Sequence, residues 1–256
     1  MSNFRKMTIG FVAFALAFAL IGADGPKSGE SRELPVVHHK GRMHQVMMGE
    51  LAGQVDLATP ADLPHLYAVG PLENLNGEVT IWDGHPHLTQ VNDAGVPVAV
   101  PDDEAWKKSA IFLVWAQVEL WSEHPVPAPI GDMGGLRTQI ERAAKEAGID
   151  LEKSAFPVLV EGDAEALGFH VVRKESDEDF GPEQHRRAMK KFDRHDLPVR
   201  LVGFYSRMHG GVFTHRGEPL HLHAVMPSDD GSTISGHVES VSLQAGATIK
   251  LPKMSP

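Results

Sequence analysis

The chain has 256 residues, 42% of them hydrophobic, with 24 basic and 34 acidic side chains and a formal net charge of −10. This composition is that of a folded globular protein and lies far from the polar, highly charged range of disordered chains. The acidic balance argues against a general nucleic-acid binder, which usually carries a basic face. The sequence contains no cysteine, which excludes disulfides, thiolate zinc sites, iron–sulfur clusters and cysteine nucleophiles. Its 15 histidines are the unusual feature, because imidazole is the commonest metal-binding side chain.

The N-terminal segment has the pattern of a secretory signal peptide. Arg5 and Lys6 form a short basic region, and residues 8–21 are almost entirely apolar and carry no charge. The apolar run is shorter than the roughly 20 residues that a membrane-spanning helix needs. We therefore expect residues 1–23 to be removed, and the mature protein to be exported, periplasmic and without stable membrane insertion; the alternative is an uncleaved N-terminal anchor. Residues 24–43 are predicted to form a flexible leader before a single domain over residues 44–256.

Strands dominate the rest of the sequence. Alternation of apolar and polar residues, β-branched content and turn signals such as Asp83-Gly84 predict them. The predicted strands cover residues 66–70, 78–82, 85–100 as a hairpin-like return, 110–120, 156–160, 169–172, 199–205, 220–226, 236–243 and 247–251. The other predicted elements are helices over 44–51 and 133–147, a helix or ordered loop over 181–192, a turn over 161–163 and a charged loop over 193–196. No composition break divides the chain, so the sequence predicts one strand-rich α+β domain with mixed or antiparallel sheets and few helices.

The sharpest local signal is a His-x-His pattern in a predicted strand. Side chains alternate between the two faces of a strand, so His221 and His223 point the same way, whereas Leu222 and Ala224 point the other way. A turn follows, and the next strand is expected to return His237 beside the first pair. Three histidines with an open fourth position are the ligand set of a catalytic zinc site. The alternative is a set of exposed imidazoles in a histidine-rich chain.

Two further positions near this pattern carry chemistry. The loop over residues 214–218 precedes the His-x-His strand, so His215 or Arg216 is a candidate to contact a ligand at the site; the alternative is a loop that does not border it. Glu78 begins an otherwise apolar strand after Asn76-Gly77. Its carboxylate either points inward toward the site or is exposed at the strand start.

These segments together resemble the acetolactate decarboxylase family. The family segment that ends in Gly-Glu, ahead of an Asp-Gly turn, corresponds to residues 70–78 (GPLENLNGE) and Asp83-Gly84. The family's His-x-His strand and its later Gly-Gly-His-Val segment correspond to residues 220–224 and 235–238. The resemblance extends from about residue 44 to residue 251.

The resemblance implies a function. It implies zinc held by His221, His223 and His237, with Glu78 as the acidic residue near the metal. It also implies a two-subdomain α+β fold, frequently dimeric, that converts 2-acetolactate to acetoin and carbon dioxide as a carbon–carbon lyase. Zinc in such a site acts as a Lewis acid on the hydroxyl and ketone oxygens and stabilises the negative charge that develops as carbon dioxide leaves. A carboxylate such as Glu78 can then transfer protons.

The sequence departs from the family pattern at three places. Leu159 stands where the family has an active-site arginine, whose guanidinium would pair with the substrate carboxylate. Pro71 replaces the usual threonine of the first motif, and residues 252–256 contain no counterpart of the family's C-terminal glutamate. We therefore assign Arg216 as a candidate replacement for the arginine. Two alternative functions stay open: a metal-dependent hydrolase on the same scaffold and a non-catalytic periplasmic metal- or ligand-binding protein.

Overall fold

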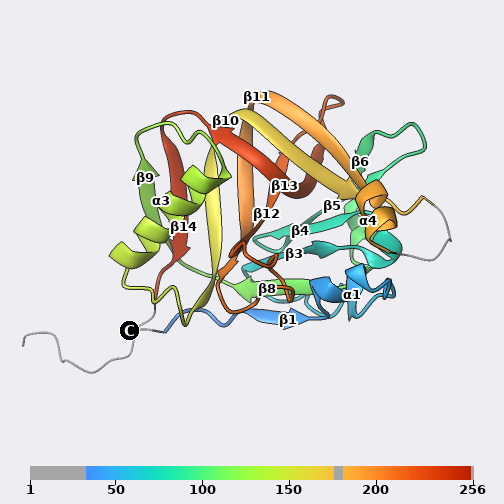
Figure 1. Ribbon diagram of the computed structural model, residues 1–256, viewed down its shortest axis with the longest axis horizontal. Helices are drawn as coiled ribbons and strands as arrows, with labels where there is room; N and C mark the ends of the chain where they lie inside the picture. Colours follow the sequence, from blue (N-terminus) through green and yellow to red (C-terminus); the bar gives the residue numbers. More distant parts are fainter. Residues whose placement is uncertain (1–32, 176–180, 255–256) are drawn as a thin grey trace, which may run out of the picture.

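The computed structural model describes residues 33–175 and 181–254 (Figure 1). The predicted signal peptide, residues 1–23, lies outside the described residues. Across the two described ranges, no helix has both the length and the apolar character needed to cross a membrane. The described chain is 15% helical and 49% strand, and every pairing between its named strands is antiparallel. The predicted strand-rich α+β class is thus confirmed.

The first sheet has six strands and carries one side of the candidate site. Its order is β1 (His38–Lys40), β8 (Leu113–Gln117), β3 (Leu66–Pro71), β4 (Glu78–Trp82), β5 (His85–Val91) and β6 (Pro97–Ala99). The turn between β4 and β5 is the predicted Asp83-Gly84, and both residues have positive φ, 49° and 79°. Two successive positive φ values match the right-handed twist of a two-residue hairpin, which explains the Asp-Gly pair.

The second sheet also has six strands and carries the histidines. Its order is β11 (Met189–Ser206), β12 (Leu220–Pro227), β13 (Thr233–Leu243), β10 (Ala155–Val172), β14 (Ala247–Pro252) and β9 (Trp121–Val126). β10 also pairs with β11 along nearly its whole length, from Ala155↔Ser206 to Val172↔Met189. The pairing of β10, β11, β12 and β13 therefore closes on itself, and these four strands form a hydrogen-bonded ring.

The remaining elements are short, except for one helix. They are the pair β2 (Val55–Asp56) and β7 (Ser109–Ala110), the helices α1 (Met43–Met47), α2 (Asp102–Ala105), α3 (Met133–Glu146) and α4 (Pro182–Ala188), and the 3₁₀ turn η1 (Glu73–Leu75). Asp132 caps the N-terminus of α3, and its side chain accepts a hydrogen bond from the backbone N–H of Gly135 at 2.7 Å. Its apolar face, with Leu136 and Ile140 buried, packs against β13 and β14 of the second sheet.

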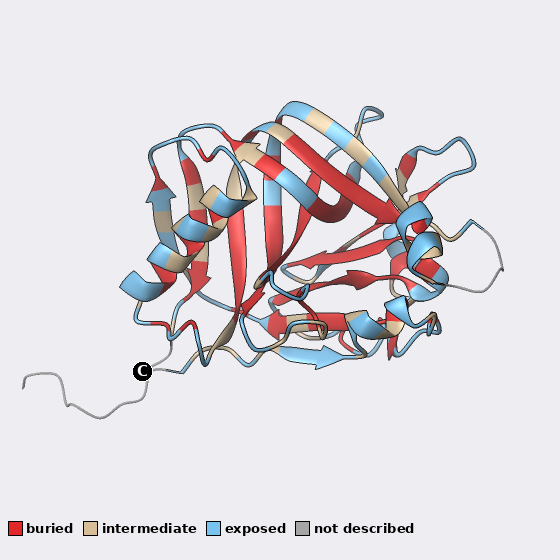
Figure 2. Cartoon of the chain, viewed as in Figure 1, coloured by how far each residue is buried: buried red, intermediate tan, exposed pale blue. Residues whose placement is uncertain are grey.

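The two sheets pack against each other, with β13 of the second sheet in contact with β4 and β5 of the first. Figure 2 shows that most of the strand surface in both sheets is buried. Leu222 and Ala224 point into the apolar core of the second sheet, whereas His221 and His223 alternate with them and face the first sheet. The polar site therefore lies between the sheets, beside an apolar cluster that includes Phe112.

Two segments that were predicted to be a turn and a loop lie inside long strands. The predicted turn over 161–163 lies inside β10, so the two strands predicted on either side of it are one 18-residue strand. A Cβ on Gly162 would lie 3.0 Å from the Cβ of Ala247, so the glycine allows close approach of β14 rather than a reversal. The predicted charged loop over 193–196 likewise lies inside β11, which pairs there with β10.

The predicted flexible leader is also corrected where the structure describes it. His38–Lys40 form β1, which pairs with β8 at the edge of the first sheet. The His38 ring stacks on Trp115 with 5.5 Å between centroids. Backbone pairing and this aromatic contact offset the entropy of ordering a polar segment that local composition predicts to be flexible.

Replacing one buried and one exposed leucine by alanine tests which side chains form the core. Leu201 lies in β11 with no exposed surface, whereas Leu120 is 59% exposed. We expect Leu201→Ala to lower the free energy of unfolding by about 2–5 kcal/mol, because it leaves a cavity. Leu120→Ala should change it by less than about 0.5 kcal/mol. Urea denaturation of the metal-free protein measures both, and equal midpoints for the two variants would contradict the assigned packing.

Candidate metal centre

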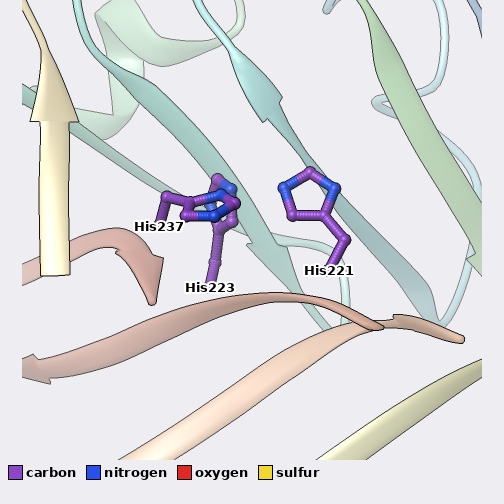
Figure 3. Close-up of side chains that lie close together, drawn as sticks. All are labelled: His221, His223 and His237. Atoms are coloured by element: carbon purple, nitrogen blue, oxygen red, sulfur yellow. The ribbon is translucent and has the colours of Figure 1, made fainter. Parts of the chain in front are cut away.

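Three histidines meet on the face of the second sheet that looks toward the first. His221 and His223 come from β12, and His237 comes from β13, directly opposite His223 in the strand register. Figure 3 shows the three rings gathered on one side of the strands that carry them. The structure thus brings together the three histidines that the sequence pattern singled out.

The spacing of these rings suits a single metal ion. The ring centroids of His221 lie 5.1 Å from His223 and 4.8 Å from His237, and those of His223 and His237 lie 5.5 Å apart. Tetrahedral zinc with Zn–N bonds of about 2.0–2.1 Å would place its imidazole ring centres about 5 Å apart. One nitrogen from each ring lies within 4.8 Å of the others. Small side-chain shifts would bring the three nitrogens to bonding distance.

The nitrogens of these rings are arranged for ligation. Thr80 Oγ1 on β4 shares a hydrogen bond of 3.0 Å with His223 Nδ1. This bond fixes the ring and leaves Nε2 as the nitrogen that could bind a metal ion. His223 Nε2 and His221 Nδ1 are buried, and neither has a hydrogen-bond partner among the described residues. A buried nitrogen without a partner costs free energy, and a bound cation would remove that cost. The residues present therefore fit a divalent metal ion.

The electrostatics of the metal-free site favour neutral imidazoles. Burial, with nearby His215 adding to the shift, lowers the pKa of His221 to about 3. Burial also places the pKa values of His223 and His237 well below the usual value, with the neighbouring histidines adding to the shift. A neutral ring keeps the lone pair that a metal requires.

Glu78 is inside the site. It begins β4 immediately after Gly77, whose φ of 124° and close approach to the Thr89 carbonyl exclude a side chain there. The Glu78 carboxylate is 3% exposed, with one oxygen 3.9 Å from His223 Nε2. Burial raises the pKa of this carboxyl well above its usual range, and a hydrogen bond with the Val172 backbone opposes the shift. Of the two placements left open for Glu78, the structure has the inward one.

The structure adds two site residues that the sequence analysis did not identify, His170 and Glu239. His170 on β10 lies directly opposite His237, and the two rings stack with 4.6 Å between centroids. Its Nδ1–H donates to Glu239 Oε1 at 2.8 Å, and this hydrogen bond, together with that of Lys191, lowers the pKa of Glu239 to about 2. Two signals were available in the sequence. His170 interrupts an apolar strand segment, and Glu239 is two residues from His237 and so shares its strand face.

The cavity at the centre has a volume of about 70 Å³. Its lining joins the polar groups of the site to an apolar wall made by Met43, Val46, Leu75, Phe112, Val172 and Met189. His215 lines the cavity, with its ring 5.4 Å from that of His237. Arg216 is exposed and is not among the lining residues, so the structure does not bring it together with the histidines.

Leu159 lies on the site side of β10, at the other end from His170. It pairs with Val202 of β11, and Val202 pairs with His223 of β12. Its side chain is 2% exposed and belongs to an apolar cluster that also contains Val202 and Phe204. This position therefore supplies apolar packing, separated from His223 by Val202, and no charge.

Comparison with solved structures identifies the fold. No protein-family model and no curated protein matches the sequence. The alpha-acetolactate decarboxylase of Bacillus subtilis strain 168 matches with a TM-score of 0.67 and 15% identity, over 85% of this chain and 86% of that one. The acetolactate decarboxylase of Bacillus subtilis subspecies spizizenii matches with a TM-score of 0.65, 14% identity and coverage of 84% and 85%. A Staphylococcus aureus protein of unknown function, described as similar to alpha-acetolactate decarboxylase, matches with a TM-score of 0.64 and 14% identity, over 84% of each chain. The resemblance inferred from the sequence motifs is thus confirmed in three dimensions, and the chain has the alpha-acetolactate decarboxylase fold.

Proposed function

We propose that the protein is a zinc-dependent decarboxylase that converts 2-acetolactate to acetoin and carbon dioxide. The observation that carries this proposal is the set of three buried imidazoles, His221, His223 and His237, facing the buried carboxylate of Glu78 on this fold. Metal-binding nitrogens and a carboxylate that can carry a proton are the two components that such a decarboxylation needs.

The reaction breaks one carbon–carbon bond and makes one carbon–hydrogen bond. The bond between C2 and the carboxylate breaks, carbon dioxide leaves, and the electron pair stays on the remaining hydroxyketone fragment. When bound, zinc supplies a Lewis acid that lowers the energy of this negative charge. A proton must then be added at carbon to give acetoin.

In this proposal, residues of the chain position His223, transfer the proton and exclude water. Thr80 Oγ1 holds His223 in place through Nδ1. Glu78, with an oxygen 3.9 Å from His223 Nε2, is the group that we propose to hold the proton that the carbon takes up. The apolar wall beside them, which includes Met43 and Phe112, suits the methyl groups of the substrate and keeps water away from the reacting carbon.

One feature of the cavity favours the alternative functions. Among its described lining residues there is no lysine or arginine, and the nearby β10 position holds Leu159. A substrate carboxylate would therefore depend on an imidazole N–H donor such as His215 for its contacts with the chain. A metal-dependent hydrolase, or a non-catalytic metal- or ligand-binding protein, would not require a fixed cation there.

We further propose that the mature protein is exported to the periplasm and forms a homodimer. The export proposal rests on the basic and apolar pattern of residues 1–23. The dimer proposal rests on the family that the sequence motifs resemble.

Zinc binding is tested by removing one ligand. The wild-type mature chain should bind about one zinc ion, and His221→Ala should lose most of that binding, because two imidazoles hold zinc far more weakly than three. His195→Ala is the matched control, since His195 is exposed on β11. Mass spectrometric metal analysis after dialysis measures both. Normal zinc content in His221→Ala would remove this residue from the ligand set.

Turnover is tested with racemic 2-acetolactate and a colorimetric acetoin assay on the zinc-loaded protein. Wild type should release acetoin, and Glu78→Gln should lower kcat by about 100-fold or more, because the amide cannot transfer a proton. Zinc content should be measured in the same samples. A wild-type protein that binds zinc but forms no acetoin would contradict the decarboxylase proposal and favour one of its two alternatives.

A further inference from the structure

His170 presents a nitrogen to the site without belonging to the three-histidine set. Its side chain is 8% exposed, and its Nε2 lies 3.8 Å from Glu78 Oε1. This separation exceeds that of a direct hydrogen bond, so the two groups face each other across a short gap. His170 is thus a second buried imidazole directed at the same carboxylate that faces His223.

Glu239 fixes the orientation of the His170 ring. A carboxylate oxygen can only accept, so the 2.8 Å contact with Glu239 places the proton of the neutral ring on Nδ1. Lys191 holds the other Glu239 oxygen at 3.1 Å. A carboxylate that orients a histidine through one ring nitrogen, leaving the other nitrogen free, is the usual support of a metal ligand.

Glu78 connects the two imidazoles. One of its oxygens faces His170 Nε2 at 3.8 Å, and its other oxygen faces His223 Nε2 at 3.9 Å. A carboxylate placed in this way can bind a second cation through Oε1 while Oε2 stays beside the three-histidine centre. Paired metal ions in enzymes lie about 3.5–4 Å apart, a separation that one bridging carboxylate can span.

We propose that His170 Nε2 and Glu78 Oε1 form a second divalent-cation position beside the three-histidine centre, with Glu239 as its positioning residue. One imidazole, one carboxylate oxygen and water form an oxygen-rich ligand set, which suits Mn²⁺ or Mg²⁺ better than zinc. The position rests on the metal centre of the proposed function but not on the identity of its substrate.

The second position also lies close to the protein surface. Glu239 and His237 line both the inner cavity and an open outer cavity of about 370 Å³. Glu239 is partly exposed, with 33% of its side-chain surface accessible. The proposed second position thus lies nearer the surface than the fully buried His223.

The test is a Mn²⁺ titration of protein already loaded with one equivalent of zinc, with free Mn²⁺ measured by electron paramagnetic resonance. Wild type should bind about one further Mn²⁺ per chain without releasing zinc. His170→Ala should weaken Mn²⁺ binding by at least about tenfold while keeping its zinc. Glu239→Ala should weaken it as well, and Glu239→Gln should restore part of it, because the amide oxygen still accepts from His170. His195→Ala is the control and should bind Mn²⁺ as wild type does.

The second position would be overturned if the zinc-loaded wild type bound no Mn²⁺, if Mn²⁺ displaced zinc, or if His170→Ala kept the Mn²⁺ affinity of the wild type. Loss of zinc from His170→Ala would also overturn it, because His170 would then belong to the first ion. Zinc content and acetoin release from the same wild-type sample separate this failure from failure of the proposed function.

Discussion

The candidate site depends on the register in which β10, β13 and β12 pair. His170, His237 and His223 lie directly opposite one another across these three strands. In an antiparallel sheet, a slip of one residue moves every side chain of a strand to the other face. Such a slip in β12 would bury both of its histidines in the apolar core of the second sheet and turn Leu222 toward Glu78. His170, His237 and His223 therefore come together only when β10, β13 and β12 pair in the correct register.

Contacts between the sheets hold this arrangement against Glu78. The hydroxyl of Ser235 on β13 donates to the His87 carbonyl on β5 at 2.6 Å, and the Ser235 backbone N–H donates to Thr89 Oγ1 at 2.7 Å. Thr80 on β4 bonds directly to His223. Thr80, Thr89, His223 and Ser235 are buried, so these bonds are costly to break. They fix the face of the first sheet that carries Glu78 relative to the histidines on the second.

Local sequence patterns predicted the elements that are specified by their own residues. β4, the His-x-His strand and the helix begun by Asp132 each have clear periodicity or a clear turn or cap beside them, and the structure contains all three. The continuation of β10 through residues 161–163 was not predictable in the same way. It depends on pairing with β11 and on the close approach of Ala247, which are contacts between segments distant in sequence.

The site shows the same limit. The three histidines could be grouped because a hairpin joins them, whereas His170 reaches them from a strand about 50 residues earlier in the chain. Glu78 was identified as a candidate, but its direction depended on how the first sheet packs on the second. Spacing within one hairpin can be inferred from sequence, but proximity between separate segments requires the fold.

The division of the site between two sheets has a mechanical consequence. The second sheet, whose strands β10 to β13 form a closed ring, carries the imidazoles, and the first sheet carries the carboxylate. A small sliding of one sheet over the other would change the distance from Glu78 to His223 while leaving the distances among the three imidazoles as they are. The spacing among the imidazoles and the distance from them to Glu78 are thus separable properties of this fold, and substitutions far from the site can adjust the second without changing the first.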